Sequence, residues 1–149
     1  MATDAKTGQP IFHGSTRAGL RNVGSYQVSG MPYITGSSLV SGQEVQISFP
    51  YVTKEITVIA SGSSIGPLRV HFNSISASYN VTGSGGNHFI SLDSHEDAVT
   101  FNVKCKEIWL STPQGDASGF RLYASLTNIP TSSMFALTGS GLTDGSDTV

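Results

Sequence analysis

The stretch FNVKCKEIWLS, residues 101–111, decides how this chain is expected to fold. Phe101, Val103 and Cys105 fall on one face of an extended strand, whereas Ile108 and Leu110 fall on the other. An apolar row that changes face is typical of a β-bulge, or of a chain that crosses from one sheet of a sandwich to the other. The stretch therefore predicts a β fold with a bend here, and it leaves both explanations open.

A two-residue period runs through the central sequence and predicts strands with one buried face. Large apolar residues alternate with polar ones in residues 44–49, 68–73 and 120–126, and glycine- and serine-rich segments separate the runs. We expect an all-β, two-sheet antiparallel β-sandwich of jelly-roll or immunoglobulin-like type, with about eight strands and a hairpin that joins 88–92 to 99–105. The expected core comprises Val45, Ile47, Phe49, Val58, Val70, Phe72, Val99, Phe101, Val103, Leu122 and Leu126.

The composition indicates one domain with a hydroxyl-rich surface of little charge. The chain has 149 residues, of which 12% are charged, and a net charge of −2. Without a basic field, nucleic acid is not an expected partner. The single cysteine excludes an internal disulfide, and no apolar run is long enough for a signal peptide or a membrane span. We therefore expect a protein that is made in the cytosol and binds no membrane and no cofactor.

Cys105 is expected to be a buried, unreactive side chain because it continues the apolar row of Phe101 and Val103. His71 is expected on a polar strand face, where it could meet His88, but the local spacing of metal ligands is missing. The sequence therefore predicts neither a catalytic site nor a metal site.

Two features could serve a binding function. The turn DSHED, residues 93–97, could hold calcium, but it lacks the glycine and the regular spacing of a calcium loop, so we interpret it as a hairpin turn. Aromatic side chains could line a sugar-binding face, although the sequence does not cluster them and core or rim packing is favoured. These residues are Tyr33, Tyr51, Trp109 and Tyr123.

The two ends of the chain differ from its middle. Residues 1–24 and 131–149 flank an expected sandwich domain at 25–130 and carry opposite net charge. Their bulky apolar residues lie outside the alternating pattern, and a single domain has no evident use for them. Disordered tails are one interpretation. The other is extended arms that dock on a neighbour, whose surface offsets the entropy cost of ordering them. The candidate protein-interface residues are Phe12, Arg17, Leu20, Arg21, Met134, Phe135 and Leu137.

Several segments together resemble small virion structural proteins of tailed bacteriophages, particularly those of marine cyanophages. They include GLRNVGSYQVSGMPYITGS (19–37), ISFPYVTKEITV (47–58), LRVHFNS (68–74) and YASLTNIP (123–130). The resemblance implies a non-enzymatic virion protein that is made in the host bacterial cytoplasm. The leading expectation is a capsid decoration or cement protein that binds the major capsid protein and itself, as a trimer or other homo-oligomer. The alternatives are a carbohydrate- or receptor-binding component of a fibre or tail, and another neck or tail protein.

Overall fold

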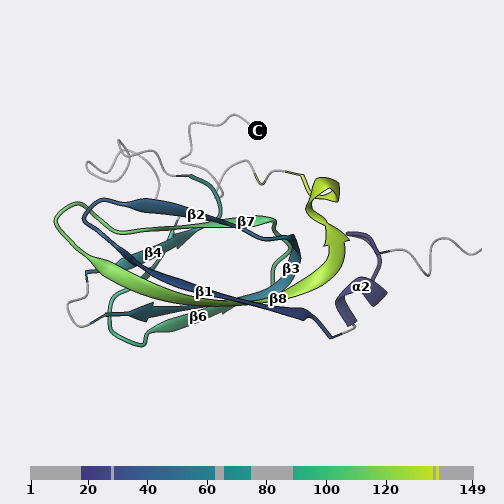
Figure 1. Ribbon diagram of the computed structural model, residues 1–149, viewed down its shortest axis with the longest axis horizontal. Coiled ribbons are helices and arrows are strands. Elements are labelled where there is room, and N and C mark those ends of the chain that lie inside the picture. The colour runs from purple at the N-terminus through teal and green to yellow at the C-terminus, as the bar shows by residue number, and fades with distance from the viewer. Residues whose placement is uncertain (1–17, 28, 63–65, 75–88, 136, 138–149) are drawn as a thin grey trace, which may run out of the picture.

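Two antiparallel four-stranded sheets face each other in the computed structural model, which describes residues 18–27, 29–62, 66–74, 89–135 and 137 (Figure 1). The first sheet has the strand order β1-β8-β3-β6, and the second sheet has the order β2-β7-β4-β5. The strands are β1 (Met31–Leu39), β2 (Glu44–Ser48), β3 (Tyr51–Ser61), β4 (Leu68–His71), β5 (Ile90–Leu92), β6 (Ala98–Phe101), β7 (Glu107–Ser111) and β8 (Ser118–Pro130). The short helix α2 (Gly24–Gln27) precedes them, and the 3-10 turn η1 (Thr131–Ser133) follows.

The strand pairs are nested along the chain. β4 pairs with β5, β3 with β6, β2 with β7 and β1 with β8, each time antiparallel. This is the arrangement of one long hairpin folded over into two sheets, which defines a jelly roll. The expected two-sheet β-sandwich is confirmed, and of its two expected types the pairing selects the jelly roll. The expected hairpin between 88–92 and 99–105 is wrong, because β5 and β6 belong to different sheets.

The face switch in residues 101–111 is a crossing between the sheets. β6 ends at Phe101 in the first sheet and β7 begins at Glu107 in the second. Thr53 of β3 holds the connecting segment: its N–H donates to the Cys105 carbonyl at 3.0 Å, and its hydroxyl donates to the Val103 carbonyl at 2.8 Å. The same hydroxyl accepts the Cys105 N–H at 3.2 Å. One buried side chain therefore fixes the place where the chain changes sheets.

The core lies between the two sheets. Of the expected core residues, six are buried: Ile47, Phe49, Val58, Val70, Leu122 and Leu126. The other five are partly buried and pack against this core: Val45, Phe72, Val99, Phe101 and Val103. Strand alternation therefore located the core well.

Strand β1 was not predicted, and its sequence explains why. Pro32 cannot donate to a ladder and is tolerated at a sheet edge, which is where β1 lies. A Cβ atom on Gly36 would come within 2.8 Å of the Phe120 carbonyl, so a glycine suits the pairing with β8 at this position. Pairing with β8, more than local β-propensity, places this segment in the sheet.

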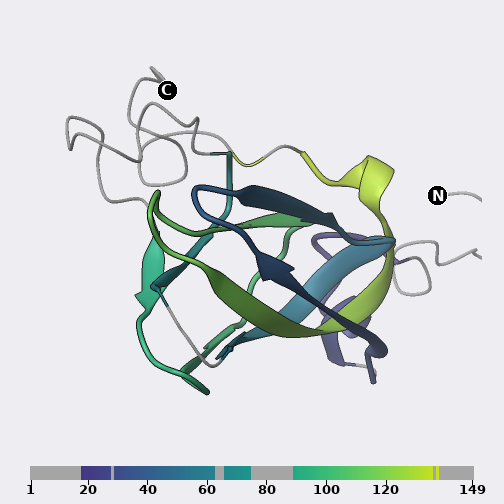
Figure 2. The same ribbon diagram turned by 60° about the vertical axis from the view of Figure 1, so that its left-hand side comes forward.

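A second, smaller apolar cluster closes one end of the sandwich. Val52, Ile129 and Met134 form it, and the partly buried Leu20 and Tyr26 pack against it. Both views place α2 and η1 near this end (Figures 1 and 2). The described segments on either side of the eight strands therefore belong to the folded body.

Candidate interaction surface

Three of the predicted interface residues pack within this chain. Met134 is only 6% exposed and lies against Val52 and Ile129. Leu20 and Leu137 are partly buried against the same cluster. The premise that a single domain has no use for these side chains is therefore wrong for Leu20, Met134 and Leu137.

The other predicted interface residues are exposed or lie outside the described part of the chain. Phe135 is 67% exposed, and Arg21 is also exposed. Phe12 and Arg17 lie outside the described residues. An interface role for the seven residues stays a prediction. Of those that the structure describes, Phe135 is the large apolar side chain that is exposed.

A row of uncharged side chains crosses the outer face of the first sheet, the face turned away from the second sheet. Ile34 of β1 pairs with Tyr123 of β8, Tyr123 with Thr57 of β3, and Thr57 with Thr100 of β6. We call these four residues the outer strip. Ile34 is 77% exposed and Tyr123 39%, while the Thr57 and Thr100 hydroxyls lie 2.9 Å apart. Exposed apolar groups on a sheet face are a common feature of interaction sites.

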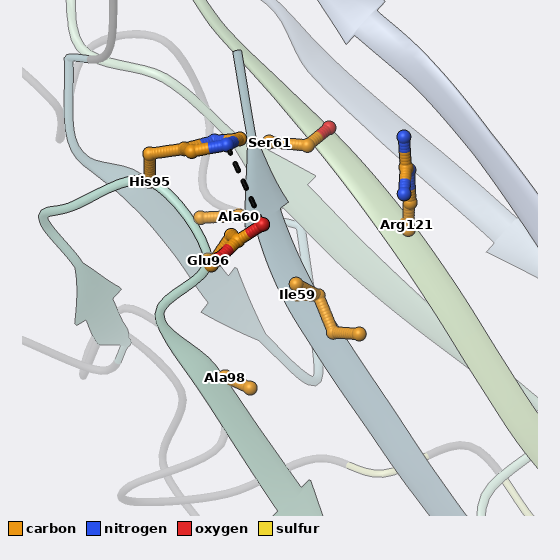
Figure 3. A pocket seen from close by; sticks show the side chains of 7 residues that line it. All are labelled: Ile59, Ala60, Ser61, His95, Glu96, Ala98 and Arg121. Carbon is orange, nitrogen blue, oxygen red and sulfur yellow. Dashed lines mark ion pairs between the residues drawn. The ribbon is translucent and has the colours of Figure 1, made fainter.

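Beside the outer strip lies a hollow of about 330 Å³. Its floor is the next row of the same sheet, in which Arg121 pairs with Ile59 and Ile59 with Ala98. The turn that follows β5 supplies His95 and Glu96, which stand on the opposite side of Ile59 from Arg121 (Figure 3). The hollow is lined by Ile59, Ala60, Ser61, His95, Glu96, Ala98 and Arg121.

The sequence pattern does not mark Ile34 or Arg121 as candidate site residues. Ile34 lies in the strand that it missed. Arg121 stands in the alternating run 120–126, where the pattern predicts an outward side chain but cannot name its neighbours.

A buried histidine and serine form a hydrogen-bonded pair in the second sheet. His71 Nε2 lies 2.9 Å from the Ser111 hydroxyl, and His71 Nδ1 lies 2.7 Å from the Asn73 carbonyl. The sequence predicts a polar strand face for His71, and its partners there are polar, but the position is buried: His71 is 1% exposed and Ser111 is fully buried. Burial lowers the pKa of His71 from 6.5 to about 4, so the ring is neutral at pH 7. The spacing is that of a base and a nucleophile, but this burial leaves a substrate no access to either group.

Cys105 is buried, as expected, with 1% exposure. Burial raises the pKa of its thiol, which favours the protonated and less nucleophilic form. Its lack of reactivity stays a prediction.

The remaining candidates are dispersed. Within the described ranges, His, Cys, Asp and Glu side chains form no group of three that could hold a metal ion, and His88 lies outside them. In the turn 93–97, the Asp97 carboxylate accepts the N–H groups of Asp93 and Ser94. The aromatic residues do not gather into one face, because Tyr33 packs edge-on against Phe49 inside the sandwich and Trp109 belongs to the second sheet.

Comparison with known proteins gives a structural likeness and no family. No family model and no curated protein matches the chain. The chain is similar to the crystal structure of the Yersinia pseudotuberculosis-derived mitogen, with a TM-score of 0.37 and 11% identity over 66% of this chain and 88% of that one. Likeness at this level carries no functional argument. In the described part of the chain, no helix is long and apolar enough to cross a membrane.

Proposed function

We propose that this chain is a non-enzymatic virion structural protein of a tailed bacteriophage, and that it decorates the capsid shell by binding the major capsid protein. The observation that carries the proposal is the outer strip. Its side chains form an uncharged row on an accessible sheet face, with Ile34 77% exposed. The resemblance of most of the chain to small virion structural proteins supports the same role.

The energetics suit a repeated contact. Burying a side chain such as Ile34 or Tyr123 contributes roughly 1.5 to 3 kcal/mol, so one copy of the strip gives a modest affinity. Many copies on a lattice, and contacts between copies, would multiply it. The exposed Phe135, which follows Met134 in the chain, offers a second anchor of the same size.

Jelly rolls occur in viral capsid domains and in lectins, so the fold is compatible with the proposal without deciding it. The buried position of the His71–Ser111 pair supports a role without catalysis, because a nucleophile must reach its substrate.

The test compares two variants that place the same charge on the two edge strands β1 and β2. Ile34→Asp puts a carboxylate into the outer strip, and Ser48→Asp puts one on an exposed position of the second sheet. Both proteins should fold, as thermal melts would verify. In sedimentation with capsid shells of the same phage, Ile34→Asp should reduce binding about tenfold or more, and Ser48→Asp should leave it unchanged. Equal binding by both variants would contradict the strip as the contact.

The number of copies per virion, measured by quantitative mass spectrometry, tests the position on the particle. Many copies support a shell protein, whereas a handful support a neck, tail or vertex protein.

A second candidate function, favoured by the hollow, is carbohydrate or receptor binding in a fibre or tail. A concave site with a few convergent polar groups on an apolar floor is a common form of small-ligand site. The hollow has an apolar floor of Ile59 and Ala98, flanked by polar groups from two different elements.

A further inference from the structure

The hollow is built from rigid parts. Its floor belongs to three paired strands, and backbone bonds fix the turn above it to β3. Glu96 N–H donates to the Ala60 carbonyl at 2.9 Å, and Ala60 N–H donates to the Asp97 carbonyl at 2.8 Å. Gly62 N–H donates to His95 Nδ1 at 3.3 Å, which makes Nδ1 an acceptor and leaves the ring proton on Nε2. The backbone of the turn that carries His95 and Glu96 is therefore positioned before any ligand arrives.

Glu96 has a backbone conformation that glutamate rarely adopts. Its φ is 68°, in the left-handed region where glycine is favoured. Such a residue persists only where its surroundings hold it, and positions of this kind cluster at ligand-binding sites. Here the bond to Ala60 holds the backbone, and the side chain stands beside the hollow (Figure 3).

The charges on the two sides of the hollow are opposite. Arg121 lies on one side, and its planar guanidinium matches a carboxylate with two parallel hydrogen bonds. Glu96 lies on the other side, with His95 Nε2 at 3.7 Å from its Oε1. A carboxylate at that position accepts hydrogen bonds from hydroxyls and repels a second negative charge. The pattern suits a ligand with one negative end and hydroxyls at the other, and it disfavours a phosphate.

The apolar floor and the volume of the hollow narrow the class of ligand further. Ile59 lies between Glu96 and Arg121, and Ala98 extends this apolar surface below Glu96; together they fit the C–H face of a sugar ring, with Ser61 also lining the hollow (Figure 3). A volume of about 330 Å³ is at the small end of ligand sites, and it suits a single ring. Tyr123 lies two residues beyond Arg121 on the same face of β8, about 7 Å away, where its ring can stack on a neighbouring unit.

We propose that the hollow binds a hexuronic acid unit of an acidic polysaccharide, with the carboxylate on Arg121 and hydroxyls on Glu96 and Ser61. The inference rests on the second, carbohydrate-binding candidate and does not depend on attachment to a shell. Uronate binding is tested with the isolated protein, whereas shell attachment is tested with particles. Either hypothesis can therefore fail while the other holds.

The experiment is a titration of the isotope-labelled protein, followed by NMR, with three matched probes. Glucuronate carries both the carboxylate and the hydroxyls, glucose lacks the carboxylate, and acetate lacks the hydroxyls. Glucuronate should shift the amide signals of Ser61, Glu96 and Arg121 in a saturable way, and a glucuronate oligomer should bind more tightly and also shift Tyr123. Glucose and acetate should each bind about tenfold more weakly or worse. No saturable shift with glucuronate, or equal affinity for glucose or acetate, overturns the proposal.

Variants separate binding from folding. Arg121→Gln should reduce the affinity for glucuronate about tenfold or more, while Arg21→Gln, which removes an exposed cation elsewhere, should not change it. Glu96→Gly removes the carboxylate and suits the positive φ, so it should raise the melting temperature and lower the affinity. An unchanged affinity in Arg121→Gln or in Glu96→Gly shows that the hollow is not the site.

Discussion

Substitution of Thr53 by valine tests how the chain is held where it crosses between the sheets. Valine has nearly the shape of threonine but no hydroxyl. Its introduction leaves the Cys105 N–H without its acceptor at a position that is 1% exposed, and it removes the bond to the Val103 carbonyl. A buried donor without a partner costs about 1 to 3 kcal/mol, and a lost hydrogen bond about 0.5 to 1.5 kcal/mol. We expect Thr53→Val to lower the free energy of unfolding by about 1.5 to 4.5 kcal/mol.

The matched control is Thr53→Ser, which keeps the hydroxyl and removes one methyl group, at a cost of about 1 kcal/mol. Urea unfolding, followed by the fluorescence of Trp109, gives both values, provided that the slope of the free energy with urea stays the same. The hydrogen bonds predict that valine, the closer match in shape, is the more destabilising replacement. If Thr53→Val costs no more than Thr53→Ser, the hydroxyl does not hold the crossing.

Three further predictions concern buried groups. Burial lowers the pKa of His71 from 6.5 to about 4, so between these values the unfolded chain binds the proton and the folded chain does not. The His71 contribution to the free energy of unfolding should therefore be level above about pH 7 and fall by up to about 3 kcal/mol towards pH 4. Unfolding titrations should show this loss in the natural chain and not in His71→Gln, and the same slope in both would contradict it. Cys105 should react slowly with a thiol reagent in the native state and quickly in denaturant, because it is buried and burial raises the pKa of its thiol; rapid native labelling would contradict this. Met134→Ala should cost about 2 kcal/mol through the space left beside Val52 and Ile129, whereas a cost near zero in a thermal melt would show that Met134 does not stabilise the domain.

Alternation in the sequence predicts which residues face the core. It does not predict which strands pair with each other. It located Ile47, Val70 and Leu122 because their burial depends on a period of two, which local sequence carries. It missed β1, since Pro32 and Gly36 interrupt the pattern and only pairing with β8 defines that strand.

The candidate site depends on long-range pairing in the same way. Arg121 and Ile59 are neighbours because β8 lies beside β3, and the turn that connects β5 of the second sheet to β6 of the first supplies Glu96. Similarly, alternation with Val70 places His71 on the polar face of its strand. Its hydrogen-bond partner Ser111 belongs to another strand, which the local sequence does not indicate. Tertiary structure alone brings these residues together.

The nested pairing of the strands also has a consequence for biosynthesis. β8 lies between β1 and β3 in the first sheet, yet it is the last of the eight described strands to leave the ribosome. Until then β1 has no neighbour in its sheet. This uncharged, partly apolar strand therefore stays unpaired while more than half of the chain is translated. Contacts so distant in sequence form slowly, and unpaired strands of a nascent chain are prone to associate with each other. We therefore expect slow synthesis or a chaperone to raise the yield of folded protein. A chaperone should no longer be needed once residues 118–130 have emerged and β8 can pair with β1.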